Sequence, residues 1–178
     1  MKFRLISRVL GIGLIAFSFL QLTPIIVSII YNEDNIVAFA YSFLITLAFG
    51  SFLYLVNFEK KYEGIRVKEG FLLTVLLWLF FTIFATLPLI FGSKSGLSIV
   101  SAYFEATSGL TTTGATIFSD LSGEYYSILF YRGLLQWIGG LGIIVLAIAL
   151  MPLQGVGRMQ LYRGETQGPI NQSKLRPK

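Results

Sequence analysis

The chain has 178 residues, of which 54% are hydrophobic and only 13% are charged. A soluble domain usually carries about a quarter charged residues, so this composition and the mean hydropathy of +0.73 indicate an integral membrane protein. The chain has no cysteine and no histidine, which excludes a disulfide framework and removes the commonest general base. The net charge of +5 comes from short basic flanks between apolar blocks, so it indicates membrane topology rather than nucleic-acid binding.

Four segments are apolar over roughly the 20 residues that a helix needs to cross the hydrocarbon core of a bilayer. They span residues 9–30, 36–56, 71–91 and 126–151. The first is too long for the apolar part of a signal peptide, so we interpret it as a retained span. The sequence therefore predicts an all-α integral membrane protein with four transmembrane helices.

Basic residues orient these four segments. All lysines and arginines except Lys94 and Arg132 lie before the first segment, between the second and the third, or after the fourth. The short connection between the first two segments carries Glu33 and Asp34 instead. Because cytoplasmic flanks are enriched in lysine and arginine, we expect both termini to be cytoplasmic and residues 92–125 to face outward.

A short helix is expected within this outward connection. Ser98 can cap a helix that begins at Ile99, and Gly109 can end it in a left-handed conformation. A helix over residues 99–108 rises about 15 Å, roughly half of the hydrocarbon core, so it can enter the membrane but cannot cross it. The chain must then return outward, which predicts one re-entrant pore helix followed by a filter loop.

The returning loop is rich in threonine and glycine. Non-helical backbone survives at membrane depth only when it packs within protein or faces water. Carbonyl oxygens of such a loop can replace the hydration shell of a potassium ion, and a helix ending beside them adds the negative pole of its dipole. We therefore expect an ion filter, with potassium held at Thr111 and Thr112 in particular. The filter residues are Thr111, Thr112, Thr113 and Gly114. The alternative interpretation is an ordinary extracellular turn.

Four further residues are expected to support the loop: Glu105, Gly109, Ala115 and Arg132. We favour Glu105 as an acceptor for loop backbone N–H groups, because a buried carboxylate needs local donors. The alternatives for Glu105 are direct attraction of cations and an exposed position at the water boundary. For Arg132 we favour a side chain that reaches the interface, and the alternative is a pair with Glu105 or Asp120.

No arrangement of residues indicates an enzyme. Serine and threonine hydroxyls are abundant, but without histidine or cysteine they lack the usual catalytic partner. The cluster of Gly139, Gly140 and Gly142 lies inside an apolar segment rather than after a strand, so it does not indicate a nucleotide-binding loop. We expect these glycines to allow close packing of helices rather than a kink.

Three stretches of the chain resemble one known family. Residues 104–116, 135–143 and 155–166 are similar to the Trk-type (TrkH/TrkG) potassium uptake subunits of the Trk/Ktr/HKT superfamily. Thr-Thr-Thr-Gly alone is a weak signal. It becomes specific together with Gln-Trp-Ile-Gly-Gly-Leu-Gly and the later Met-Gln-Leu-Tyr-Arg.

The resemblance implies an architecture of four tandem helix–pore-loop–helix units around one pore, preceded in some members by an extra helix pair. On this basis residues 1–57 form the helix pair, 58–70 a cytoplasmic loop, 71–152 the first unit and 153–178 a cytoplasmic linker. Residues 111–114 then provide one quarter of the selectivity filter.

The resemblance also implies the ligand and the partners. The ligand is the potassium ion, with no organic cofactor, and the location is the bacterial inner membrane. The expected partners are further pore units or a second complete subunit in a homodimer, membrane lipid, and a cytoplasmic nucleotide-binding TrkA-like regulatory subunit. No nucleic-acid partner is expected.

The chain ends at Lys178, where the second unit of the family would begin. We therefore expect potassium uptake by this chain as the N-terminal part of a transporter subunit. Two alternatives stay open: a stand-alone homo-oligomeric cation channel built from several copies, and a non-transporting membrane interaction subunit or inactive fragment.

Overall fold

The computed structural model describes residues 3–56 and 67–150. The chain divides into two compact units, residues 1–142 and 143–178, and the description below concerns the first. The expected linker 153–178, and most of the expected cytoplasmic loop 58–70, lie outside the described residues. The functional division into a helix pair (1–57) and a pore unit (71–152) stays a prediction; the first compact unit contains all of the former and the latter as far as residue 142.

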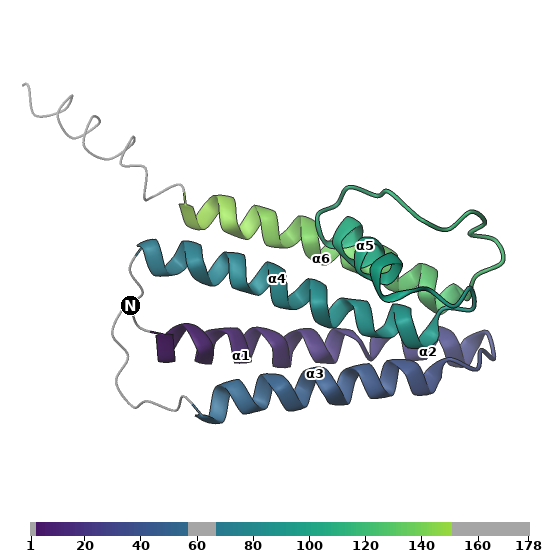
Figure 1. Cartoon of the computed structure of the whole chain (residues 1–178), viewed down its shortest axis with the longest axis horizontal. Helices are drawn as coiled ribbons and strands as arrows, with labels where there is room; N and C mark the ends of the chain where they lie inside the picture. The colour runs from purple at the N-terminus through teal and green to yellow at the C-terminus, as the bar shows by residue number, and fades with distance from the viewer. Residues whose placement is uncertain (1–2, 57–66, 151–178) are drawn as a thin grey trace, which may run out of the picture. The chain divides into compact units, whose positions relative to one another are not determined.

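The regular secondary structure of the described residues is all helical (Figure 1). Its elements are α1 (Phe3–Leu20), α2 (Thr23–Ile30), α3 (Ile36–Val56), α4 (Val67–Gly92), α5 (Ile99–Leu110) and α6 (Tyr126–Leu150). Within the described residues, four helical stretches are long and apolar enough to cross a membrane, namely 3–30, 36–56, 69–92 and 126–144. The four transmembrane helices expected from the sequence are thereby confirmed, together with the bounds of α3.

The first membrane stretch is broken into α1 and α2 at Gln21 and Leu22. Pro24 stands in the first turn of α2, where its missing N–H costs nothing. The Thr23 hydroxyl donates to the Leu20 carbonyl at 2.8 Å, which satisfies one of the acceptors left free where α1 ends. The two helices therefore follow one another with a turn between them that places Gln21 in the protein interior.

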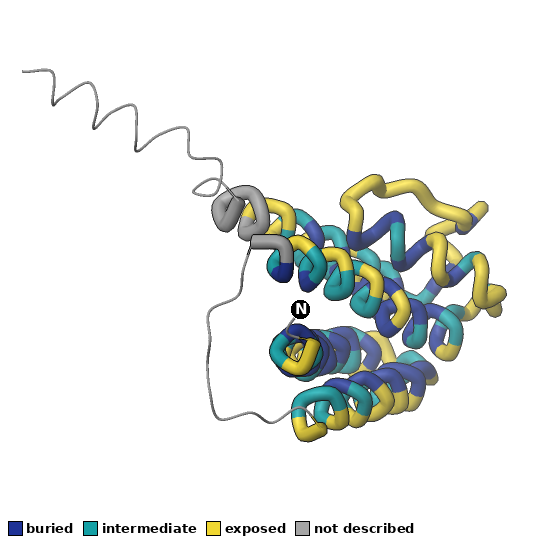
Figure 2. Tube along the Cα trace, turned by 60° about the vertical axis from the view of Figure 1, so that its left-hand side comes forward, coloured by how far each residue is buried: buried dark blue, intermediate teal, exposed yellow. Residues whose placement is uncertain are grey.

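Glycines and aromatic rings hold α1, α3 and α4 together. A Cβ atom on Gly11 of α1 would lie 2.7 Å from the Gly50 carbonyl oxygen of α3, so these two helices approach closely because both positions lack a side chain. The rings of Phe17 and Phe81 stack with centroids 4.8 Å apart and join α1 to α4. Figure 2 shows the buried faces of these helices turned toward one another and the exposed faces turned outward.

The short helix α5 packs on α4 and α6. It begins at Ile99, and the Ser98 hydroxyl accepts from the Ser101 N–H at 3.2 Å, so the expected cap is confirmed. The expected left-handed end at Gly109 is wrong, because α5 continues to Leu110. Gly109 serves contact instead: a Cβ there would lie 3.0 Å from the Leu135 Cβ atom of α6. At 12 residues, α5 rises about 18 Å and is too short to cross a bilayer.

Candidate functional site

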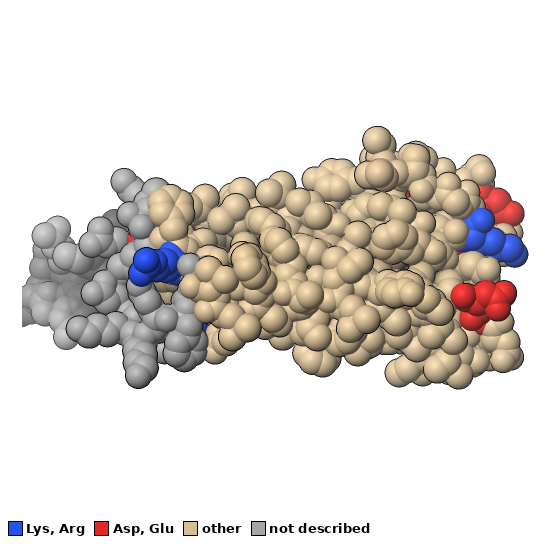
Figure 3. All heavy atoms as spheres, turned by 60° about the horizontal axis from the view of Figure 1, so that its bottom comes forward, with Lys and Arg blue, Asp and Glu red and all other residues tan. Residues whose placement is uncertain are grey.

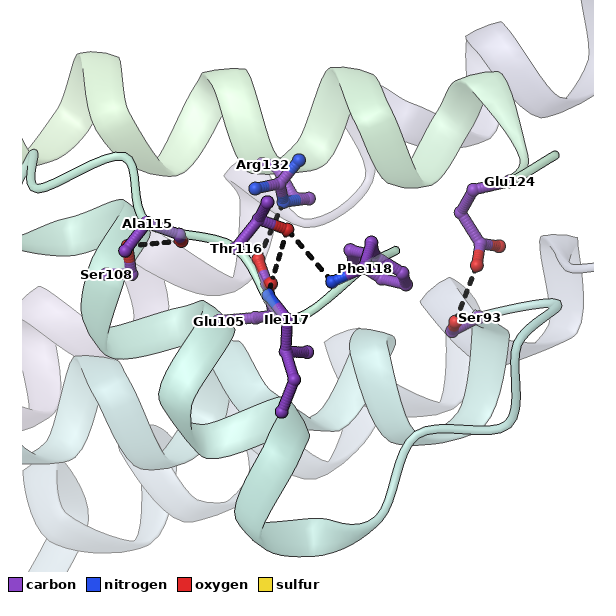
Figure 4. Close-up of polar contacts among 9 residues, drawn as sticks. All are labelled: Ser93, Glu105, Ser108, Ala115, Thr116, Ile117, Phe118, Glu124 and Arg132. Atoms are coloured by element: carbon purple, nitrogen blue, oxygen red, sulfur yellow. Dashed lines mark hydrogen bonds and ion pairs between the residues drawn. The ribbon is translucent and has the colours of Figure 1, made fainter. Parts of the chain in front are cut away.

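The loop after α5 turns back along the helix that precedes it (Figure 4). The N–H groups of Thr112 and Thr113 donate to the carbonyls of Gly109 and Ser108, each at 3.0 Å. Two residues of the turn have a left-handed backbone, Thr112 with φ 59° and Gly114 with φ 75°. Glycine adopts this conformation freely, whereas a threonine does so rarely. The left-handed position expected at Gly109 therefore falls at Thr112 and again at Gly114.

The carbonyl oxygens of the loop fall into two groups. The Ala115 carbonyl accepts a hydrogen bond from the Ser108 hydroxyl at 2.6 Å (Figure 4). In the part of the chain that the structure describes, no donor reaches the carbonyl oxygens of residues 111–114. These four residues are also exposed within the first compact unit. Between α5 and Ala115, the loop thus has four consecutive carbonyl oxygens that accept no hydrogen bond from the described residues.

Glu105 lies on α5 and accepts hydrogen bonds from the part of the loop that runs back along this helix. Its side chain is buried, and its Oε1 atom accepts from the Thr116 hydroxyl at 2.7 Å and from the Ile117 N–H. The Thr116 hydroxyl oxygen in turn accepts from the Phe118 N–H at 3.2 Å. One carboxylate oxygen therefore joins α5 to two consecutive residues of the loop, and the Thr116 hydroxyl extends this network to Phe118 (Figure 4).

The other carboxylate oxygen of Glu105 binds α6. The Arg132 Nε atom donates to Glu105 Oε2 at 2.8 Å, and the Arg132 guanidinium also lies over the Phe118 ring at 5.4 Å from its centroid. The favoured interpretation of Arg132, a side chain reaching the interface, is wrong, because only 12% of it is exposed. Asp120 is not its partner, since that carboxylate accepts from the Ser122 N–H and hydroxyl instead.

Glu105 and Arg132 form an ion pair with no net charge, and both carboxylate oxygens of Glu105 accept hydrogen bonds. A carboxylate with three donors and a compensating positive charge is stable at low solvent exposure, and the side-chain exposure of Glu105 is 0%. Glu105 therefore lies behind the loop rather than at its exposed surface. This geometry favours a supporting role for Glu105 over direct attraction of cations.

A second buried carboxylate, that of Glu124, accepts hydrogen bonds from the connection between α4 and α5. It accepts from the Lys94 N–H at 2.6 Å, and also from the Ser93 hydroxyl and the Ser95 N–H and hydroxyl. Burial raises the pKa of Glu124, but hydrogen bonds from Lys94, Ser95, Tyr125 and Ser93 outweigh it, so the pKa lies below its ordinary value. No sequence pattern marks Glu124, since an acidic residue before a helix is a weak signal by itself.

Two residues of the connection between α2 and α3 contact the same ends of α4 and α6. The Glu33 carboxylate accepts from the Tyr126 and Ser127 N–H groups at 2.6 and 3.1 Å, so it caps α6 from a distant part of the chain. The Asn35 amide donates to the Ser127 hydroxyl at 2.8 Å and to the Gly92 carbonyl at 3.3 Å. The connection between α2 and α3 is thereby joined to the end of α4 at Gly92 and to the start of α6.

The low pKa of Glu124 makes stability depend on pH. Because the folded pKa lies below the unfolded one, the carboxylate stabilises the fold at pH values above the unfolded pKa. That contribution is lost as pH falls through the folded value. We expect the melting temperature in mild detergent to fall below about pH 4.3, the usual pKa of glutamate. Glu124→Gln should melt lower at pH 7 and show a weaker pH dependence. An unchanged pH dependence in Glu124→Gln would contradict this role.

Known proteins match this chain in sequence and in fold. A profile of the TrkH family, described as a cation transport protein, matches residues 35–178. The chain is 46% identical over 178 residues to the Trk system potassium uptake protein TrkH of Escherichia coli, and 36% identical over 175 residues to TrkG of the same organism. A crystal structure of the potassium transporter TrkH from Vibrio parahaemolyticus matches with a TM-score of 0.82 and 40% identity, over 89% of this chain and 34% of that one.

These matches cover nearly all of this chain but a smaller part of each relative. The alignment with the E. coli TrkH covers 100% of this chain and 37% of the relative, and the alignment with TrkG covers 98% and 36%. The chain therefore spans a little more than a third of the length of the curated relatives that it matches.

Proposed function

The chain belongs to the TrkH family of cation transport proteins, and from that membership we propose that it supplies one pore-lining unit of a Trk-type potassium uptake protein of the bacterial inner membrane. The family transports cations, so the chain is not an enzyme. The transported ion is proposed to be potassium because the relatives are named potassium uptake proteins.

One observation carries this proposal: the carbonyl oxygens of residues 111–114 have no donor among the described residues, whereas the neighbouring Ala115 carbonyl is fastened to Ser108. A filter needs carbonyls that are held in place but not already hydrogen-bonded. The carboxyl end of α5 stops at Leu110 beside them and adds the negative pole of its dipole. In this proposal Thr111 and Thr112 contact the potassium ion directly, and Thr113 and Gly114 complete the strand.

A single loop supplies one quarter of a filter, so the proposal requires further pore units. The resemblance to Trk-type subunits supports a homodimer of complete subunits and a cytoplasmic, nucleotide-binding TrkA-like regulatory partner. Lipid covers the remaining apolar faces, which carry exposed side chains such as Ile26, Phe52 and Val75.

The charge distribution supports cytoplasmic termini. Figure 3 shows acidic and basic side chains together at one end of the helices, and basic side chains near the other end. The residues of the acidic end include Glu33, Asp34, Lys94 and Asp120, whereas Arg4 and Arg8 lie near the start of α1. Cytoplasmic flanks of bacterial membrane proteins are enriched in lysine and arginine, so we assign the end with the pore loop to the outside.

The test is potassium uptake in a bacterial strain that lacks its own potassium transporters. The chain is expressed alone, and also together with a TrkH relative from which the matching part has been deleted. We expect growth at low potassium from the combination, and at least a tenfold loss of uptake with Gly114→Asp, because an aspartate would strain the left-handed turn and place a carboxylate among the filter carbonyls.

Gly96→Asp is the matched control. Gly96 also has a left-handed backbone (φ 63°) and nothing within 4 Å of a new Cβ atom, but it lies in the connection before α5. The control should transport normally. Rescue by the chain alone would instead favour a homo-oligomeric channel. If the combination is present in the membrane but gives no uptake, the proposed pore unit is wrong.

A further inference from the structure

Pro88 leaves one carbonyl of α4 without its helical donor. In an α-helix the N–H of each residue bonds the carbonyl four residues earlier, and proline has no N–H. Pro88 lies inside α4, so the freed carbonyl is that of Phe84. In the hydrocarbon region an unsatisfied carbonyl has no water to bond, so a protein donor must take its place.

Gln21 supplies this donor. Its side chain is fully buried, and its Nε2 atom donates to the Phe84 carbonyl at 3.0 Å. Its Oε1 atom accepts from the Thr46 hydroxyl of α3 at 3.1 Å. A carbonyl can only accept, which fixes the orientation of the amide. The side chain thereby links the break between α1 and α2 to both α3 and α4.

Other side chains also bond backbone carbonyls of α4 near Pro88. The Thr82 and Thr86 hydroxyls donate to the carbonyls of Trp78 and Thr82, each at 2.8 Å, and such bonds to the preceding turn bend helices. The Tyr131 hydroxyl of α6 donates to the carbonyl of Ala85 at 3.2 Å. Proline kinks are commonly satisfied in this way by neighbouring helices.

We propose that Gln21 is a positioning residue for the pore loop: its amide replaces the hydrogen bond that Pro88 removes, and so fixes the direction of the outer end of α4. Residues 93–98 connect that end directly to α5, whose own end carries the loop at 111–114. The break between α1 and α2 contributes to this contact, because it places the Gln21 side chain beside the turn of α4 that contains Pro88.

A double-mutant cycle tests the link. In Gln21→Met, which keeps the length of the side chain without its hydrogen bonds, we expect the melting temperature of the 178-residue chain in mild detergent to fall by about 2–4 °C. Pro88→Ala restores an N–H for the Phe84 carbonyl. In the Pro88→Ala background the loss caused by Gln21→Met should be less than half as large. Equal losses in both backgrounds would overturn the proposal.

Ser42→Ala is the control for general loss of a buried hydroxyl. Ser42 is fully buried in α3, and among the described residues its hydroxyl donates within its own helix, to the Ala38 carbonyl at 2.8 Å. Its effect should be the same with Pro88 and with alanine at that position. If Gln21→Met alone yields no folded protein, Pro88→Ala should restore folded protein, and failure to do so also overturns the proposal.

A distance measurement separates positioning from stability. The chain contains no cysteine, so spin labels at Val75→Cys on α4 and Ile99→Cys on α5 report one distance without background; both positions are exposed. We expect Gln21→Met to broaden or shift this distance, and Pro88→Ala to give one distribution whether or not Gln21 is present. An unchanged distribution in Gln21→Met refutes positioning. The importance of Gln21 for uptake rests on the proposed function, but these two measurements do not involve transport, so the two proposals can fail separately.

Discussion

Replacing Glu105 with leucine should destabilise the fold by about 3–5 kcal/mol, the usual cost of removing one partner of a buried ion pair. The substitution leaves the Arg132 guanidinium without its carboxylate at 12% side-chain exposure. It also removes the acceptor for the Ile117 N–H and the Thr116 hydroxyl. Thermal unfolding in mild detergent, followed by tryptophan fluorescence, measures the loss.

The two partners of this pair should not be equivalent. Arg132→Met leaves the Glu105 carboxylate with two donors from the loop, whereas Glu105→Leu leaves the guanidinium with the Phe118 ring alone among the partners described above. We therefore expect Arg132→Met to cost less than Glu105→Leu. Glu33→Gln is the control: that carboxylate caps α6 and is only half-buried, so its replacement should cost about 1 kcal/mol. Equal losses for all three would contradict a buried network centred on Glu105.

The membrane spans could be predicted because each is marked by one long, continuous run of apolar residues. Helices of about 20 apolar residues have few alternatives, and the bounds of α3 and the starts of α5 and α6 follow from composition and one serine cap. The end of α5 could not be predicted in the same way. A glycine that ends a helix and a glycine that contacts a neighbouring helix look alike in sequence, and Gly109 is of the second kind.

Polar contacts between residues far apart in the sequence could not be predicted either. The role of Glu105 could be predicted because a lone carboxylate in a short apolar helix needs donors, and its loop partners lie only 11 and 12 residues away. Gln21 and Asn35 bond residues 63 and 92 positions away, so no local pattern marks them. A proline inside a transmembrane helix does carry information, since it frees one carbonyl whose number is known. The identity of the donor then depends on packing.

The glycine cluster of α6 gives the second large expected effect, and the structure separates its members. Gly139→Ala should prevent α5 from packing on α6, because the new Cβ atom would lie 2.0 Å from the Leu110 carbonyl oxygen and 2.8 Å from the Leu110 carbonyl carbon. These are backbone atoms at the end of α5, so no side-chain rotation relieves the clash. We expect a loss of at least about 3 kcal/mol, or no folded protein in the membrane.

The neighbouring glycines provide matched controls in the same helix. A Cβ atom on Gly140 would lie 3.9 Å from its nearest neighbour, the Thr112 methyl group, and one on Gly133 would meet nothing within 4 Å. Alanine at either position should be neutral or stabilise the helix by about 0.5–1 kcal/mol, since glycine is the poorer helix former. Because Leu110 is the residue from which the loop at 111–114 departs, Gly139→Ala should also abolish uptake wherever folded protein remains, whereas Gly133→Ala should not. A stable, transporting Gly139→Ala protein would show that the contact between Gly139 and Leu110 does not position the loop.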